Sequence, residues 1–298
     1  MMRINPNILP DLMDALSTNQ QQINTDLAEI SSGESVSQPS DDPAAAASLV
    51  LNANQTAEAD QYLRSLGSIQ SELQSADSTL STVITSLQQA ISLGTEGANG
   101  TVNASDRAAI AAQVQGIQSQ LLSLSNLSYQ GTYVFAGTAN QSPPYVLDAT
   151  SPSGVTYSGN SNSNSVTLGE NFSIQTNLPG LQLFSAPGHD MFQAIQDLIT
   201  NLQSGNTAGI SAAVGEVSDA SNYVDTQRVF YGNAISQLSS QQTYLNSETT
   251  ELAQQQSTIG GADLPAVISN LESEQVSRQA TLEAISQTQQ NNLFSYLK

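Results

Sequence analysis

Apolar residues recur every seven positions near the start of the chain, which is the spacing of a coiled-coil helix. The first line of this pattern consists of Leu9, Leu16, Ile23 and Ile30. A second line on the same face is expected at Met13, Gln20 and Leu27. The pattern predicts a helix over about 8–31, which Gly33 and the proline-containing stretch 37–43 interrupt.

A second helix is predicted to begin at Pro43, because Asp41 or Asp42 ahead of a proline is typical of an N-cap. Its later part alternates four- and three-residue steps through Tyr62, Leu66, Ile69, Leu73, Ala76, Leu80, Val83, Leu87 and Ala90. After three glycines, Ser105 is expected to cap a third helix. The apolar line of that helix is Ile110, Val114, Ile117, Leu121 and Leu124.

The C-terminal half repeats the theme with eight apolar residues at strict seven-residue spacing. They are Ile210, Val217, Val224, Tyr231, Leu238, Leu245, Leu252 and Ile259. The neighbouring line is mostly polar, so the seam is narrow. Gly260 and Gly261 end this helix, and a last helix is predicted to run from Leu264 to Tyr296.

The middle of the chain has a different pattern. Seven of the fifteen Tyr and Phe residues lie within 129–188, between turn-rich stretches, which indicates short strands. The candidate strands are 133–135, 145–147, 155–157, 166–168, 172–175 and 181–184. The predicted fold is therefore mainly α with a small β insert, an α+β chain whose two ends form long antiparallel coiled-coil helices.

Three domains are expected from this order of elements. Residues 1–41 with 262–298 would form a terminal coiled-coil assembly domain, 42–130 with 189–261 a helical rod, and 131–188 an outer β-rich domain. The terminal helices have narrow seams flanked by Gln, Ser and Asn, so they bury too little apolar area to order by themselves. A soluble coiled coil with a solvated polar face is the simpler interpretation of the same pattern.

The net charge of the chain argues against anionic binding partners. The 298 residues carry 6 Lys and Arg against 26 Asp and Glu, a net charge of −20, and the cations are far apart in sequence. Binding to nucleic acid or to an anionic membrane surface is therefore not expected. The absence of Cys excludes disulfides and thiolate catalysis. No signal-peptide pattern is visible, so any export is expected to proceed without a cleaved signal.

Catalytic chemistry has little support in the sequence. His189 is the only histidine, and it lies where a helix N-cap is expected, so a structural role is favoured over a catalytic or metal-ligating one. Asp41 and Asp42 could suggest a hard-cation site, but capping explains both carboxylates. We therefore expect no enzyme activity, no cofactor and no metal site.

The terminal helices instead predict an assembly interface that orders on association, with both ends dynamic in isolation. Its apolar residues are Leu9, Leu16, Ile23, Ile30, Leu271, Leu282, Ile285, Leu293, Phe294, Tyr296 and Leu297.

Several motifs resemble the flagellin superfamily, in the form typical of its hook-associated branch. They are Ser31-Ser-Gly33 with Pro39-Ser-Asp-Asp-Pro43, Ala98-Asn-Gly-Thr101, Gly131-Thr-Tyr-Val-Phe-Ala-Gly137 and Asn292-Leu-Phe-Ser-Tyr-Leu297. The motif residues singled out are Asp41, Asp42, Pro43, Gly131, Tyr133, Phe135 and Gly137. Glu34 and Val36 depart from the pattern, since relatives often carry basic residues there.

The resemblance implies a structural protein of the bacterial flagellum. It would be exported through the type III channel, form a ring of copies at the hook–filament junction, and join the first hook-associated protein to flagellin. It implies those two proteins, further copies of the chain and an export chaperone as partners, outside the cell. A short filament flagellin stays open as an alternative, as does a secreted enzyme if His189 lined a deep polar pocket.

Overall fold

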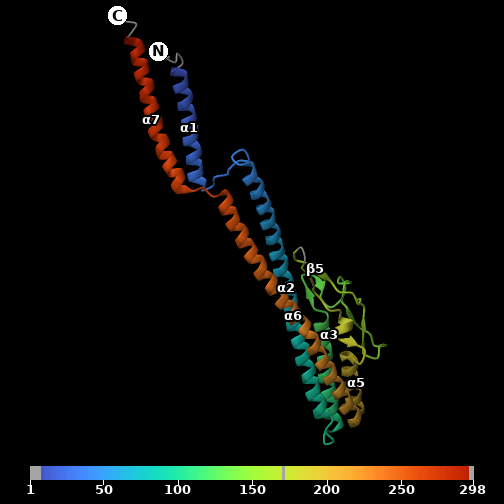
Figure 1. The fold of residues 1–298 in the computed structure, drawn as a ribbon. Coiled ribbons are helices and arrows are strands. Elements are labelled where there is room, and N and C mark those ends of the chain that lie inside the picture. Colours follow the sequence, from blue (N-terminus) through green and yellow to red (C-terminus); the bar gives the residue numbers. More distant parts are fainter. Residues whose placement is uncertain (1–7, 170–171, 295–298) are drawn as a thin grey trace. The chain divides into compact units, whose positions relative to one another are not determined.

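The computed structural model describes residues 8–169 and 172–294, with side chains up to residue 289. It divides into two compact units, 1–58 with 247–298 and 59–246. Two long helices, α2 (Pro43–Gly97) and α6 (Thr207–Gly260), have residues in both units (Figure 1). The mainly helical fold with a small strand-containing insert is confirmed. The three-domain division with boundaries at 41, 130, 188 and 261 stays a prediction.

The first unit pairs the two chain ends. Helix α1 (Ile8–Ser32) lies along α7 (Leu264–Phe294), and Figure 1 shows the two helices side by side. The N-terminal helix over 8–31 is thus confirmed, but its expected second line is wrong. Helix α1 buries Asn19, Ile23 and Asp26, whereas Met13 and Leu27 are 57% and 50% exposed. Seven-residue spacing identifies residues that share one helix face. It does not determine which of two neighbouring lines on that face packs against the partner helix.

A backbone hinge joins α1 and α7 to the neighbouring helices of the first unit. Gly33 adopts the left-handed conformation (φ 73°) that ends α1, and Glu34 forms an isolated antiparallel bridge with Gly261. The Ser35 N–H donates to the Gly260 carbonyl at 2.7 Å, and the Ala262 N–H donates to the Gly33 carbonyl at 2.9 Å. The segments 33–35 and 260–262 therefore run antiparallel to each other and are joined by two backbone hydrogen bonds.

The second unit has a conventional apolar core. The predicted seam of α2 is buried from Leu66 to Ala90, and the matching seam of α6 is buried from Ile210 to Leu245. Helices α3 (Ala104–Ser125) and α5 (Met191–Ser204) complete the helical part. The cap of α3 is Asn103 and not Ser105, because the Asn103 side chain accepts the Asp106 N–H from an extended backbone position.

Within the described residues, the β insert consists of four two-stranded antiparallel hairpins. Their strands are β1 (Ser128–Tyr129) with β2 (Thr132–Tyr133), β3 (Tyr145–Leu147) with β4 (Val155–Tyr157), β5 (Ser165–Thr167) with β6 (Ser173–Gln175), and β7 (Ser185–Ala186) with β8 (His189–Asp190). The strand expected at 181–184 is wrong: residues Gly180–Leu183 form the single helical turn α4, which presents Leu183 and then Phe184 to the core.

Candidate functional site: the assembly surfaces

The interface residues predicted on α1 differ in how far they are covered. Ile23 is 4% exposed, Leu16 and Ile30 are half-buried, and Leu9 is 36% exposed. Ile23 is therefore covered within the chain itself, while Leu9 is open to solvent. Another molecule can reach Leu9, and parts of Leu16 and Ile30, without rearrangement of α1 and α7.

The predicted residues on α7 divide in the same way. Ile285 is buried at 9%, Leu271 is half-buried and Leu282 is 47% exposed. Leu293 and Phe294 end the helix, but their side chains lie outside the described residues, as do Tyr296 and Leu297. Their assignment to an interface stays a prediction.

The sequence reasoning missed a set of large apolar side chains that point into solvent. Met13 and Leu27 belong to it, and so do Val50, Leu51 and Val276, which are 60%, 64% and 70% exposed. The pattern assigned the first two to the α1 seam and left the other three unused. Helices that expose this much apolar surface are typical of proteins that pack against further polypeptides.

Two shallow grooves accompany these exposed side chains. One, of about 590 Å³, is lined by Met13, Leu16 and Leu282 together with Gln20 and Arg278. The other, of about 580 Å³, lies at the hinge and is lined by Gly33, Val36, Leu49, Val50, Ala53 and Gly260. Apolar floors with amide rims are suited to holding aliphatic side chains of another chain.

The acidic pair before α2 has a local structural role. Asp42 accepts the Ala44 and Ala45 N–H groups at 2.9 and 3.0 Å, which makes it the N-cap ahead of Pro43. Asp41 accepts the Gln38 N–H at 2.8 Å and the Ser37 N–H at 3.1 Å. The hydrogen bond from Gln38 is the main cause that lowers the pKa of Asp41. The two carboxylates therefore shape the loop that leads into α2.

The motif 131–137 builds the base of the β insert. Gly131 and Gly137 have φ of 87° and 71°, and a side chain at Gly137 would collide with Asn160. Tyr133 is half-buried, and Phe135 is fully buried with its ring edge-to-face against Phe184 at 5.1 Å. The motif thus acts through packing and backbone conformation.

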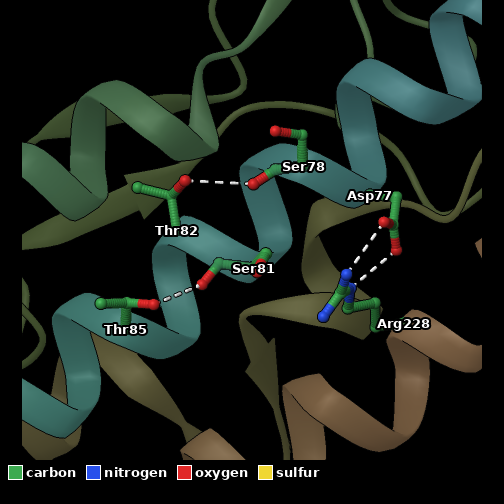
Figure 2. A network of polar contacts seen from close by, with 6 residues as sticks. All are labelled: Asp77, Ser78, Ser81, Thr82, Thr85 and Arg228. Carbon is green, nitrogen blue, oxygen red and sulfur yellow. Dashed lines mark hydrogen bonds and ion pairs between the residues drawn. The ribbon is translucent and has the colours of Figure 1, made fainter.

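A polar contact in the second unit links α2 with α6. The Arg228 guanidinium donates to both carboxylate oxygens of Asp77 at 2.7 and 2.9 Å, as Figure 2 shows. Hydrogen bonding to Asp77 raises the pKa of Arg228. Along the same stretch of α2, the Thr82 and Thr85 hydroxyls donate to carbonyl oxygens one turn earlier, those of Ser78 and Ser81 (Figure 2). The ion pair fixes how the two helices face each other.

His189 lies in a packed environment. Its ring stacks on Tyr223 with centroids 4.6 Å apart and planes 5° from parallel. The adjacent Asp190 caps α5 by accepting the Phe192 and Gln193 N–H groups, while burial raises its pKa. In the described part of the chain, no three Asp, Glu or His side chains gather where they could hold a metal ion. None of the described helices combines the length and apolarity needed to cross a bilayer.

Comparison with family models identifies both ends of the chain. Residues 4–140 match the bacterial flagellin N-terminal helical region, and residues 214–297 match the bacterial flagellin C-terminal helical region. Together the two matches include α1, α2, α3, most of α6 and α7. The helices that carry the exposed apolar side chains are thus the ones that the family shares.

Individual relatives are consistent with these matches. The chain is 27% identical over 289 residues to flagellar hook-associated protein 3 of Escherichia coli K12, which covers 91% of each chain. A Vibrio parahaemolyticus protein described as flagellar hook-associated has a similar structure, with a TM-score of 0.69, 19% identity and coverage of 74% of this chain and 100% of its own. The flagellar junction protein of Legionella pneumophila gives a TM-score of 0.60 at 13% identity, covering 72% and 100%. At such identities the structural matches show the fold.

Proposed function

Because the chain belongs to the flagellin superfamily, we propose that it is the junction subunit that joins the hook end of the bacterial flagellum to the flagellin filament. The observation that carries this proposal is the match to flagellar hook-associated protein 3 over 91% of both chains. Because it leaves out only about 9% of the chain, the match spans the middle region between the two helical ends.

The physical support lies in the first unit. The contact between α1 and α7 buries the polar residues Asn19 and Asp26, whereas the apolar Met13 and Leu27 are exposed to solvent. Burial of such side chains against neighbours contributes roughly 1.5–3 kcal/mol each. A chain built in this way gains stability by associating, which suits a structural subunit.

The partners follow from this role. We assign to the chain further copies of itself in a ring, the first hook-associated protein on the hook side and flagellin on the distal side. Its place is the hook–filament junction outside the cell, reached by type III export without a cleaved signal and with the help of an export chaperone. No nucleic acid or membrane partner belongs to this role.

A deletion strain tests the proposal. Hooks should form normally while flagellin accumulates unpolymerised in the medium, because the filament lacks its docking surface. Electron microscopy of the cells and immunoblots of the medium provide the two readouts. Filaments of ordinary length in the deletion strain would refute the junction role.

Complementation in that strain tests the surface. The variant Met13→Ser with Leu27→Ser should be exported but should not restore filaments, since it removes exposed apolar groups while the buried Ile23 and Ile285 stay in place. The matched control is Ala15→Ser with Ala28→Ser, two exposed positions on the same helix that line neither groove. Restoration by both variants would contradict the assignment of the exposed face.

Truncation tests the C-terminal end. Removal of Gln289–Lys298 should leave hooks without filaments, provided that the truncated chain is found in the medium. Export has to be measured first, because the chaperone is expected to use the C-terminal helices. An exported truncation that supports ordinary filaments would show that this end is not an assembly element.

A short filament flagellin is the second candidate, because the family models that match are those of flagellin. Sedimentation of the concentrated, purified chain separates the two. A bulk filament protein should form long polymers unaided, whereas a junction subunit should remain in small assemblies.

A further inference from the structure

The contact between α1 and α7 contains a line of polar residues at its centre. Asn19 and Asp26 are only 8% and 3% exposed, which is unusual for these side chains in a helix pair. The Asn19 amide donates to the Glu274 carboxylate across the contact, and the Gln22 amide donates to Asp26 at 3.0 Å. One oxygen of Asn19 and one of Asp26 are buried and accept no hydrogen bond from any described residue.

This polar line makes the contact between α1 and α7 less stable than an apolar line would. Buried polar atoms without a hydrogen bond destabilise a contact, and apolar residues of similar size would stabilise it. Apolar residues are available on the same helix, since Met13 and Leu27 face solvent instead. The polar line therefore does not serve the strength of the pairing.

We infer that Asn19, Asp26 and Glu274 select the register in which the two ends of the chain pair. Buried polar residues at core positions of coiled coils are known to specify alignment at the expense of stability. The apolar line of α1 repeats every seven residues, so a slip by seven residues would bring each side chain of that line to the level of the next. The inference concerns the pairing of the chain ends and does not depend on the junction role.

The spacing of the polar residues shows how selection would work. Contacts of Asn19 with Glu274, of Gln20 with Arg278 and of Gly33 with Ala262 establish one antiparallel alignment. Sliding by one heptad brings Glu274 to the level of Asp26 in one direction, because Asp26 follows Asn19 by seven residues. Two carboxylates would then share a poorly solvated site.

Sliding in the other direction is also disfavoured. It brings Glu274 to the level of the half-buried Leu12, seven residues before Asn19, where the carboxylate would lose its amide donor. A buried charged group that loses its hydrogen bond is strongly penalised. One amide and two carboxylates thus oppose both one-heptad slips.

The chain has no cysteine, so introduced pairs report the register directly. In the full-length chain at high dilution, Gln20→Cys is combined with Arg278→Cys for the native register. It is combined with Leu271→Cys or Ile285→Cys for the two slipped registers, which lie seven residues to either side. A short bismaleimide crosslinks pairs that are close, and intact mass with peptide mapping by an acid-specific protease identifies the product.

We expect the native pair to dominate in the otherwise unchanged chain. In the background Asn19→Leu with Glu274→Leu, slipped products should rise by about tenfold or more relative to the native product, since a hydrogen bond to a charged group contributes at least this factor. The matched control is Asn24→Leu with Glu272→Leu, which makes the same two exchanges at exposed positions of the same helices. It should leave the distribution unchanged.

Two outcomes would overturn the inference. If the slipped products stay as rare in the Asn19→Leu, Glu274→Leu background as in the control, the polar pair does not select the register. If all three crosslinks disappear while circular dichroism shows that the second unit is intact, the polar pair holds the helices together instead of aligning them.

Discussion

The two units apply the same heptad spacing to different side chains. In the second unit, Leu66, Leu73, Leu80 and Leu87 of the α2 seam are completely buried in the apolar core. In the first unit, α1 turns Asn19 and Asp26 toward α7 and exposes Met13 and Leu27. Full burial of a leucine contributes about 1.5–3 kcal/mol, so the second unit contains the stabilisation that the first unit lacks. Spacing alone determines that helices pair, whereas the residues at the seam determine whether the pair is sufficient by itself.

The largest effect is expected from a charge in the core of the second unit. Leu73→Asp should destabilise the monomer by more than about 4 kcal/mol, because it buries an unpaired carboxylate and removes a fully covered side chain. Thermal unfolding followed by circular dichroism measures the loss. The control Leu27→Asp, on the exposed face of α1, should leave the midpoint unchanged. Equal midpoints for Leu73→Asp and the unchanged chain would show that this seam is not a core.

Amide hydrogen exchange compares the two units without mutation. We expect α1 and α7 to open far more often than the 66–90 stretch of α2, with protection lower by about a thousandfold, because local opening follows the apolar area that holds a segment. Mass spectrometry of the dilute monomer gives the rates. Strong protection of residues 10–30 in the monomer would break the comparison.

The ion pair in Figure 2 should have a moderate effect. Its side chains are 33% and 29% exposed, so Arg228→Ala should cost about 1 kcal/mol, less at high salt. Arg228→Lys should recover only part of the loss, because lysine cannot bind both carboxylate oxygens in parallel. Arg64→Ala, at an exposed position of α2, is the control and should be neutral. Denaturant unfolding at two salt concentrations measures these changes in stability. Equal unfolding curves for Arg228→Ala and the control would show that the ion pair does not stabilise the chain.

The smallest effect concerns the cap of α5. Burial raises the pKa of Asp190, so the folded state holds its proton more readily than the unfolded state does. Its contribution is thus fully present below the ordinary carboxyl pKa and is lost as pH rises through the raised value. Asp190→Asn keeps the capping oxygen and should gain a few tenths of a kcal/mol over the unchanged chain as pH rises from about 4 to about 7.

Asp190→Ala removes the cap and should cost about 1 kcal/mol at all these pH values. Chemical denaturation at several pH values measures both variants. A gain by Asp190→Asn that does not change with pH would contradict the burial of the charged form.

The sequence was most informative where one helix face is purely apolar. The alternation from Leu66 to Ala90 has only one face that can be buried, so the core of the second unit could be predicted residue by residue. On α1 the apolar residues lie on two sides, and the choice between Ile23 and Met13 as the inner side depends on α7, which is distant in sequence. The period therefore predicted the helix but not its orientation.

Local signals failed where backbone geometry competes with side-chain type. Asn103 caps α3, although Ser105 is also a residue type that caps helices. Asn103 has the extended backbone that lets its side chain accept the N–H of the residue three positions later. Residues 181–184 are apolar enough for a strand, yet the preceding turn at Pro179 starts a helical turn. The pattern left the exposed Val50, Leu51 and Val276 unassigned, because their exposure depends on where the other helices lie.

The paired crossing at Gly33 and Gly261 also has a mechanical consequence. A single connecting strand allows rotation about its backbone bonds, so it transmits tension but little torque. Here two strands cross the same level and are tied by the Ser35 to Gly260 and Ala262 to Gly33 hydrogen bonds. Rotation about the common direction has to break these bonds or shear the bridge. The paired segments therefore resist twisting, and a torque applied to α1 and α7 is carried by the backbone hydrogen bonds of both segments together.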